Sequence, residues 1–119
     1  MYTYKAKLLR VIDGDTVDAE IDLGFGVYMK QRVRMFGINT PDSRSKDTDE
    51  KEKGLASKQR LTELLTREFV IETILNKRSK FGRVLGILYI ENADSKINVN
   101  EQMVADGFAV EYNLTAKDY

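Results

Sequence analysis

Charged and amide side chains are concentrated in one segment, RVRMFGINTPDSR, which runs from Arg32 to Arg44. The segment begins like a strand, because apolar Val33 and Met35 alternate with arginines, and it breaks at 39–42, Asn-Thr-Pro-Asp. An arginine on a strand face, followed by amide and carboxylate oxygens, can hold an anion beside a cation. The same residues also suit a plain transition from strand to loop, since Asn, Asp and Pro favour turns.

The composition restricts the chemistry that this segment can perform. Cysteine and histidine are both absent, which excludes disulfides and thiolate chemistry and removes the usual proton shuttle. Any catalysis must therefore rest on carboxylates, lysine, arginine, tyrosine or a hard metal ion. Lys+Arg and Asp+Glu both number 19, so the net charge is zero, and affinity for phosphate must come from a local basic cluster.

The elements that position these residues follow from the apolar pattern. Five segments have the alternation or the apolar run of a strand, namely 2–12, 17–22, 27–35, 69–75 and 84–90. Turn signals fall at Asp13-Gly14-Asp15 and at 23–26, a basic loop is expected at 76–82, and a turn at 91–96.

Two helices are expected between and after these strands. A charged stretch, 43–53, leads into a helix that extends to about Arg67, whose apolar stripe should place Leu55, Leu61 and Leu65 in the core. A second helix begins after Asn98, which is a good N-cap with Glu101 placed for a capping box, and stops at Gly107.

The order of three strands, a helix, two strands and a helix predicts an α+β fold. Five short strands with glycine-marked turns close well as a five-stranded OB-type Greek-key β-barrel with two to three packed helices, the first capping one end. The length of 119 residues suits a single domain, residues 1–119.

Four segments together resemble the signature segments of the staphylococcal nuclease (thermonuclease) family, in order and in spacing. They are VIDGDTV at 11–17, RVRMFGINTPD at 32–42, KFGR at 80–83 and NEQMVADGFA at 100–109. Each is weak by itself, but four in register are specific. The resemblance covers about residues 5–112, and it implies an OB-type barrel and a calcium-dependent phosphodiesterase that hydrolyses DNA and RNA.

The resemblance also implies a set of site residues. Asp15, Asn39 and the backbone carbonyl of Thr40 would bind Ca²⁺. Arg34 and Arg83 would bind phosphate, and Asp42 would act as the general base. Lys80 and Phe81 would contact the substrate. Apart from the resemblance, Tyr112 is a further candidate for substrate binding.

This sequence departs from the family at three of these positions. Asn39 stands where an aspartate is usual, so the site loses a negative charge, although amide oxygens are accepted calcium ligands. Asp42 stands where a glutamate is usual and is one methylene shorter, and a displacement of about 1 Å can reduce a rate about a hundredfold. Phe81 replaces a tyrosine and keeps a ring that can stack on a base.

These residues predict a metal-dependent nuclease, an endonuclease of low sequence specificity acting on DNA and/or RNA. A hard cation and arginine forks would stabilise the growing charge while a carboxylate takes a proton from water. The alternative is a catalytically weakened OB-type module that binds nucleic acid or protein. The nuclease interpretation requires Asp15 and Arg83 to share one cleft.

Several residues have a second interpretation. Arg32 fits a solvated strand face, the basic residues at 77–80 either face solvent or steer a strand, and Tyr112 either stacks on a base or anchors the tail. Acidic residues at 47–52 suit a helix N-terminus better than a second metal site. With no apolar run long enough to span a membrane and no visible signal peptide, we expect a cytoplasmic monomer, with secretion possible if a leader was removed.

Overall fold

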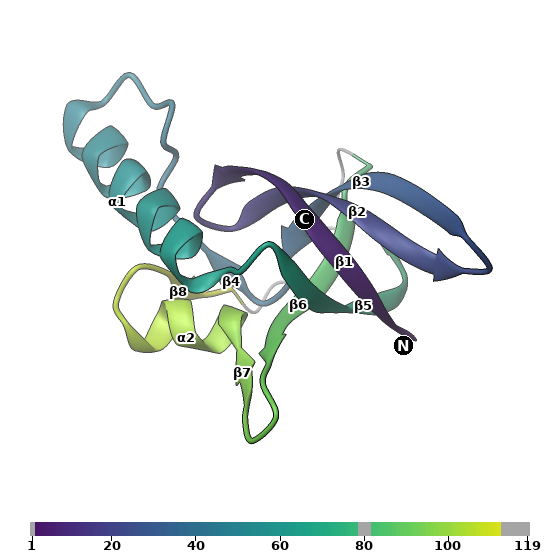
Figure 1. Cartoon of the computed structure of the whole chain (residues 1–119). Coiled ribbons are helices and arrows are strands. Elements are labelled where there is room, and N and C mark those ends of the chain that lie inside the picture. Colours follow the sequence, from purple (N-terminus) through teal and green to yellow (C-terminus); the bar gives the residue numbers. More distant parts are fainter. Residues whose placement is uncertain (1, 79–81, 113–119) are drawn as a thin grey trace.

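The first three strands form an antiparallel meander. The computed structural model describes residues 2–78 and 82–112 (Figure 1). Strands β1 (Tyr2–Asp13), β2 (Thr16–Gly24) and β3 (Val27–Met35) pair in sequence, with turns where the sequence predicted them. Because side chains alternate along a strand, Val17 and Val33 point into the core while their neighbours Thr16 and Arg34 face each other on the opposite side.

Two further strands close the barrel. Strand β5 (Glu68–Arg78) pairs with β1, and β6 (Val84–Glu91) pairs with β5. Strands β3 and β6 then join in parallel, with Arg34 opposite Leu85. The order β3-β2-β1-β5-β6, closed from β6 to β3, is the predicted OB-type barrel. The closure matters for the site, because it brings Arg34 on β3 next to the start of β6, which Arg83 precedes.

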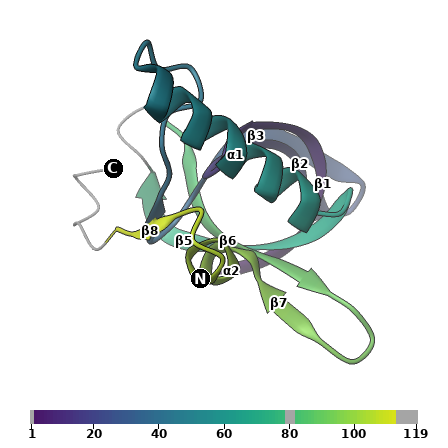
Figure 2. The same cartoon turned by 90° about the vertical axis from the view of Figure 1, so that its left-hand side faces the viewer.

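Two helices pack on this barrel, and their caps follow the predicted chemistry. Helix α1 (Thr48–Leu64) lies across one end of the barrel, with α2 (Val99–Ala105) near it (Figure 2). The Asp47 carboxylate caps α1 by accepting from the Asp49 and Glu50 amides, which supports the helix-terminus interpretation of this acidic stretch. The Asn98 side chain caps α2 by accepting from the Glu101 amide at 3.0 Å.

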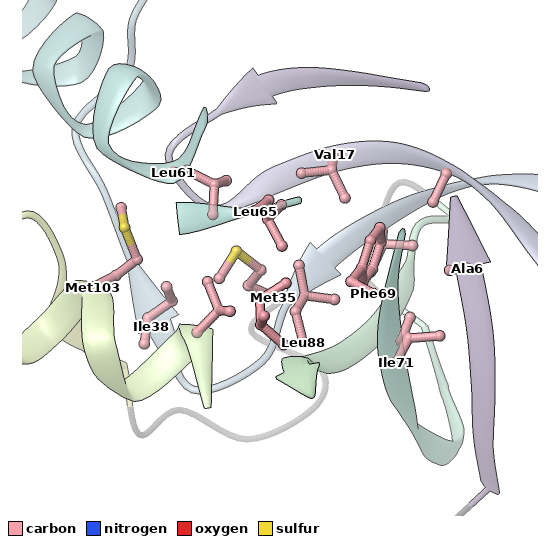
Figure 3. Packing of buried hydrophobic residues seen from close by; sticks show 14 of the residues in the cluster. Ala6, Val17, Met35, Ile38, Leu61, Leu65, Phe69, Ile71, Leu88 and Met103 are labelled. Carbon is pink, nitrogen blue, oxygen red and sulfur yellow. The ribbon is translucent and has the colours of Figure 1, made fainter. Parts of the chain in front are cut away.

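The core fills the interior of the barrel and continues to the two helices (Figure 3). Met35 and Leu88 from the barrel meet Leu61 from α1, Leu65 directly after α1, and Met103 from α2. Burial of each such side chain contributes about 1.5–3 kcal/mol. This contact fixes α1 and α2 against the end of the barrel where β3 ends.

The predicted apolar stripe of α1 was wrong at Leu55. Leu55 is 46% exposed, whereas Leu61 and Leu65 are buried as expected. The helix turns Gly54, Ser57 and Leu61 toward the rest of the molecule, and Leu55 lies about 100° around the helix from Gly54. Small residues, rather than a leucine, therefore form the N-terminal half of the buried face.

Three short strands were missed, and one strand is longer than expected. Strand β5 extends to Arg78, into the segment predicted as a loop, and β7 (Lys96–Asn98) pairs with β6 after a turn between Asn92 and Ser95. Strands β4 (Ile38–Asn39) and β8 (Val110–Glu111) pair with each other. Among the described residues, no helix is long and apolar enough to cross a membrane.

Candidate functional site

A pocket of about 260 Å³ opens where the β1–β2 turn, the end of β3 and the start of β6 meet. Most of the predicted site residues line it, although they come from distant parts of the sequence. The lining consists of Asp13, Asp15, Thr16, Arg34, Asn39, Thr40, Pro41, Asp42, Arg83 and Tyr112. Asp15 and Arg83 thus share one cleft, as the nuclease interpretation requires.

Asp15 and Arg34 form the buried wall of this pocket. Asp15 is 7% exposed and Arg34 5%, and Asp15 Oδ2 lies 3.5 Å from Arg34 Nη1. The other Asp15 oxygen accepts from Thr16 Oγ1 at 2.9 Å, and Oδ2 also accepts from the Thr40 amide at 3.1 Å. A buried charge requires such partners, so the β1–β2 turn and the loop after β4 are both held by one carboxylate.

The Arg34 guanidinium is fixed at both of its terminal nitrogens. Nη1 donates to the Met35 carbonyl at 2.8 Å, and Nη2 donates to the Asn39 amide oxygen at 3.2 Å. The fork is therefore held in one orientation before any ligand arrives. The sequence departure at Asn39 keeps an oxygen acceptor here but makes it neutral.

Arg83 brings a second guanidinium to the same pocket. It is half-buried, and its pKa is lowered chiefly by burial and next by the positive charge of Arg34, while Asp15 acts in the opposite direction. Two guanidinium groups at one partly buried site repel each other, and a bound anion would relieve that repulsion. The pocket is thus electrostatically suited to a phosphate.

The oxygen donors of the pocket suit a hard cation. Asp15 supplies a carboxylate, Asn39 an amide oxygen and Thr40 a backbone carbonyl, which are ligand types that Ca²⁺ accepts. The Thr40 hydroxyl is buried and has no hydrogen-bond partner within the described part of the chain. No cluster of three acidic residues that could hold a metal occurs in the described ranges, so a cation here would depend on neutral oxygens as well as on Asp15.

Asp42 lies at the exposed rim of the pocket. Its Oδ1 accepts from the Arg44 amide at 2.8 Å, which is a local turn of the kind that aspartate favours. The Asp42 side chain is exposed and lines the pocket. Its neighbour Ser43 is buried, so the backbone that carries Asp42 is anchored even though the side chain is exposed.

Tyr112 closes one side of the pocket. Its ring centroid is 5.9 Å from the Arg34 guanidinium carbon, and its amide donates to the Gly37 carbonyl at 2.8 Å. Both interpretations of Tyr112 therefore remain consistent with its position. The predicted substrate residues Lys80 and Phe81 lie outside the described residues.

Two neighbouring residues have roles that differ from those of the pocket core. Arg32 does not line the pocket; it is exposed and donates to both oxygens of Asp18, at 2.8 and 3.1 Å. Asp13 does line it, although the sequence analysis treated Asp13 only as part of a turn. Its carboxylate accepts from the Ser43 amide and hydroxyl. The available signal was the pair of aspartates around Gly14, of which only the second was assigned a role.

The fold and the pocket define an OB-type barrel that brings two arginines and several oxygen donors into one pocket. A family model described as staphylococcal nuclease homologue matches residues 32–119. The chain belongs to this family.

The curated relatives that match most of this chain include a thermonuclease. The chain is 31% identical to an uncharacterized protein of Methanocaldococcus jannaschii, over 97% of this chain and 63% of the relative. It is 28% identical to thermonuclease of Staphylococcus hyicus, over 87% of this chain and 56% of the relative. It is also 28% identical to an uncharacterized protein of Bacillus anthracis, over 91% of this chain and 47% of the relative. The chain thus spans about half to two thirds of the length of these relatives.

Proposed function

We propose that this protein is a calcium-dependent nuclease that hydrolyses DNA and/or RNA with little sequence preference. Family membership supports a nuclease-type or nucleic-acid-binding function. The observation that carries the finer proposal is the convergence of Asp15, Arg34 and Arg83 on one pocket with Asp42 at its rim. An anion site beside oxygen donors and a solvent-facing carboxylate is the combination that phosphodiester hydrolysis needs.

The two arginines bind the scissile phosphate in this mechanism. Their planar forks can each donate two hydrogen bonds to phosphate oxygens. Charge on those oxygens grows as water attacks phosphorus, so the interaction strengthens in the transition state and lowers the barrier. Arg34 is already oriented by Met35 and Asn39, so little reorganisation is needed.

Asp42 takes a proton from the attacking water as the new phosphorus–oxygen bond forms. The bond from phosphorus to the 5′ oxygen breaks, and this oxygen takes up a proton from solvent and leaves as a 5′-hydroxyl. The other product then carries a 3′-phosphate, as the family resemblance implies. Asp15, Asn39 and the Thr40 carbonyl would hold Ca²⁺, which supplies positive charge beside the phosphate.

A binding module without catalysis is the second candidate. One observation favours it, which is that the Asn39 oxygen is neutral and already accepts a hydrogen bond from Arg34. Such a site would hold the cation weakly and the phosphate firmly. Retention of Asp15 together with both arginines favours the enzyme.

Cleavage of a fluorescent single-stranded oligonucleotide tests the proposal. The wild-type protein should cleave it with calcium and not with a chelator, and Asp15→Ala should abolish cleavage. Asp94→Ala, at an exposed turn position, is the matched control and should keep wild-type activity. Gel retardation without cleavage under both conditions would establish the binding module instead.

A further inference from the structure

Helix α1 contains a glycine in its interior, at the point where it reaches the candidate site. Gly54 is buried within α1, although glycine in a helix interior is less stable than alanine by roughly 1 kcal/mol. A Cβ atom at this position would lie 2.5 Å from both the Asp42 carbonyl carbon and the Ser43 nitrogen. The helix backbone therefore rests directly on the Asp42–Ser43 peptide bond, at a separation that excludes any side chain.

The same face of α1 touches the turn that carries Asp15. Ser57, one helical turn after Gly54, is buried, and a Cβ at Gly14 would lie 2.6 Å from the Ser57 Cβ. The same atom would lie 3.1 Å from a Thr40 methyl carbon. One face of α1 thus contacts both chain segments of the pocket, through residues without long side chains.

A second anchor holds the segment that carries Asp42 from the side of the barrel. Asp13, at the end of β1, accepts hydrogen bonds from the Ser43 amide at 3.3 Å and from the Ser43 hydroxyl. The peptide between Asp42 and Ser43 is therefore held between β1 and α1. Since Asp42 Oδ1 bonds to the Arg44 amide, the carboxylate must follow any movement of this backbone.

We propose that Gly54 is a positioning residue for Asp42, acting by letting α1 approach the Asp42–Ser43 peptide. The inference rests on the proposed function, in which Asp42 is the base. It also bears on the sequence departure at Asp42, because a shortened carboxylate depends more strongly on where its backbone lies. Arg34 lies on β3, and Arg83 directly precedes β6, so the positions of these two arginines do not depend on this contact.

Gly54→Ala should displace Asp42 and leave Arg34 and Arg83 in place, so it distinguishes these two parts of the site. Ordinary van der Waals contact begins at 3.4 Å, so the new Cβ forces the helix and the peptide apart. A displacement near 1 Å lowers turnover about 10- to 100-fold, whereas KM, which reflects phosphate binding, should change less than about threefold. Gln59→Ala, on the exposed side of α1, is the matched control and should change neither quantity.

A double-mutant cycle with Asp42→Ala, measured as kcat with calcium, tests whether Gly54 acts through Asp42. If it does, adding Gly54→Ala to Asp42→Ala should lower kcat by less than about twofold. Equal effects of Gly54→Ala in both backgrounds would overturn the inference while leaving the nuclease proposal standing. A large rise in KM together with the fall in kcat would also overturn it, since that result indicates general disruption of the site.

Crystal structures of wild type and Gly54→Ala give a readout that does not need activity. The inference predicts that the Asp42 carboxylate moves away from Asp15, while the distance between Arg34 and Arg83 stays the same. An unmoved Asp42 overturns it, even if the wild-type protein proves inactive. If Gly54→Ala does not fold, Ser43→Ala replaces it; loss of the hydroxyl bond to Asp13, which leaves only the amide bond, should give the same selective fall in kcat, and an unchanged kcat would contradict the inference.

Discussion

Asp15 and Arg34 lie side by side in the buried wall of one pocket, with 3.5 Å between Asp15 Oδ2 and Arg34 Nη1. A carboxylate and a guanidinium that are both less than a tenth exposed attract each other more strongly than they would in water. Removing one partner leaves the other buried and unpaired, which typically destabilises a protein by about 3–5 kcal/mol. The pair therefore serves the fold as well as the proposed chemistry.

Arg83→Lys should lower turnover strongly. An ammonium group cannot offer the planar fork of a guanidinium, and loss of a preorganised donor to the transition state reduces rates about 10²–10³-fold. Steady-state kinetics on the oligonucleotide measure this, with thermal unfolding as the check on folding. Full activity in this variant would exclude Arg83 from the transition state.

Asn39→Asp should tighten calcium binding by at least about tenfold. An added negative charge at contact distance is worth several kcal/mol even at a surface-like effective dielectric constant. Isothermal titration calorimetry measures the affinity directly, without relying on catalysis. An unchanged titration midpoint would count against Asn39 as a ligand.

Thr40→Val should leave calcium affinity nearly unchanged, because the proposed ligand at this position is the backbone carbonyl. The buried hydroxyl has no partner among the described residues, so replacing it with a methyl group should leave stability equal or raise it by about 1 kcal/mol. Calorimetry and urea unfolding give the two quantities. A large loss of calcium affinity would instead make the hydroxyl a ligand.

The sequence predicted the barrel well because strand alternation is a local signal. Val17 and Val33 could be assigned to the core from their own neighbours. The pocket residues were found because their motifs are specific as a set, yet nothing local in the sequence shows that Arg34 lies opposite Leu85. That pairing depends on barrel closure between β3 and β6, which is a property of the whole chain.

Other features were missed for identifiable physical reasons. Strands β4 and β8 have two residues each, too few to show alternation, and they exist only because each pairs with the other. Leu55 was assigned to the core because leucine is apolar, while the contact face of α1 uses Gly54 and Ser57. Close backbone packing leaves no apolar signal in a sequence, so the contact at Gly54 could be recognised only in the folded structure. The same holds for Asp13, whose partner Ser43 is distant in the sequence.

Asp18→Asn should destabilise the protein at neutral pH and much less in acid. The hydrogen bond from Arg32 lowers the pKa of Asp18 in the folded state, against a smaller opposing effect of burial. The unfolded chain then binds the proton more readily, so this stabilisation is present above the unfolded pKa of about 4 and is lost as the pH falls through the lower folded value.

The free energy of unfolding of Asp18→Asn at pH 7 should be about 0.2–1 kcal/mol below that of wild type, since the Arg32 side chain is 45% exposed and solvent screens the pair. Urea unfolding of wild type and variant at pH 7 and pH 3 measures it. A difference of equal size at both pH values would show that the pair does not act through the charge of Asp18.

Asn100→Ala should destabilise the fold by about 2–4 kcal/mol. The buried Asn100 side chain accepts from the Leu88 amide at 3.0 Å and donates to the carbonyls of Phe36 and Gly86, and its loss removes the acceptor of the Leu88 amide and one donor from each carbonyl. Thermal and urea unfolding measure the effect, and Glu101→Ala, at the next and exposed position, is the control. A loss below about 1 kcal/mol would mean that other groups or water replace the amide.

A crystal structure with calcium and a nucleotide bisphosphate tests the central claim most directly. The account predicts one phosphate bound by both Arg34 and Arg83, with the ion on Asp15, Asn39 and the Thr40 carbonyl and the Asp42 carboxylate on the solvent side. A phosphate bound elsewhere, or an ion that avoids Asp15, would contradict it.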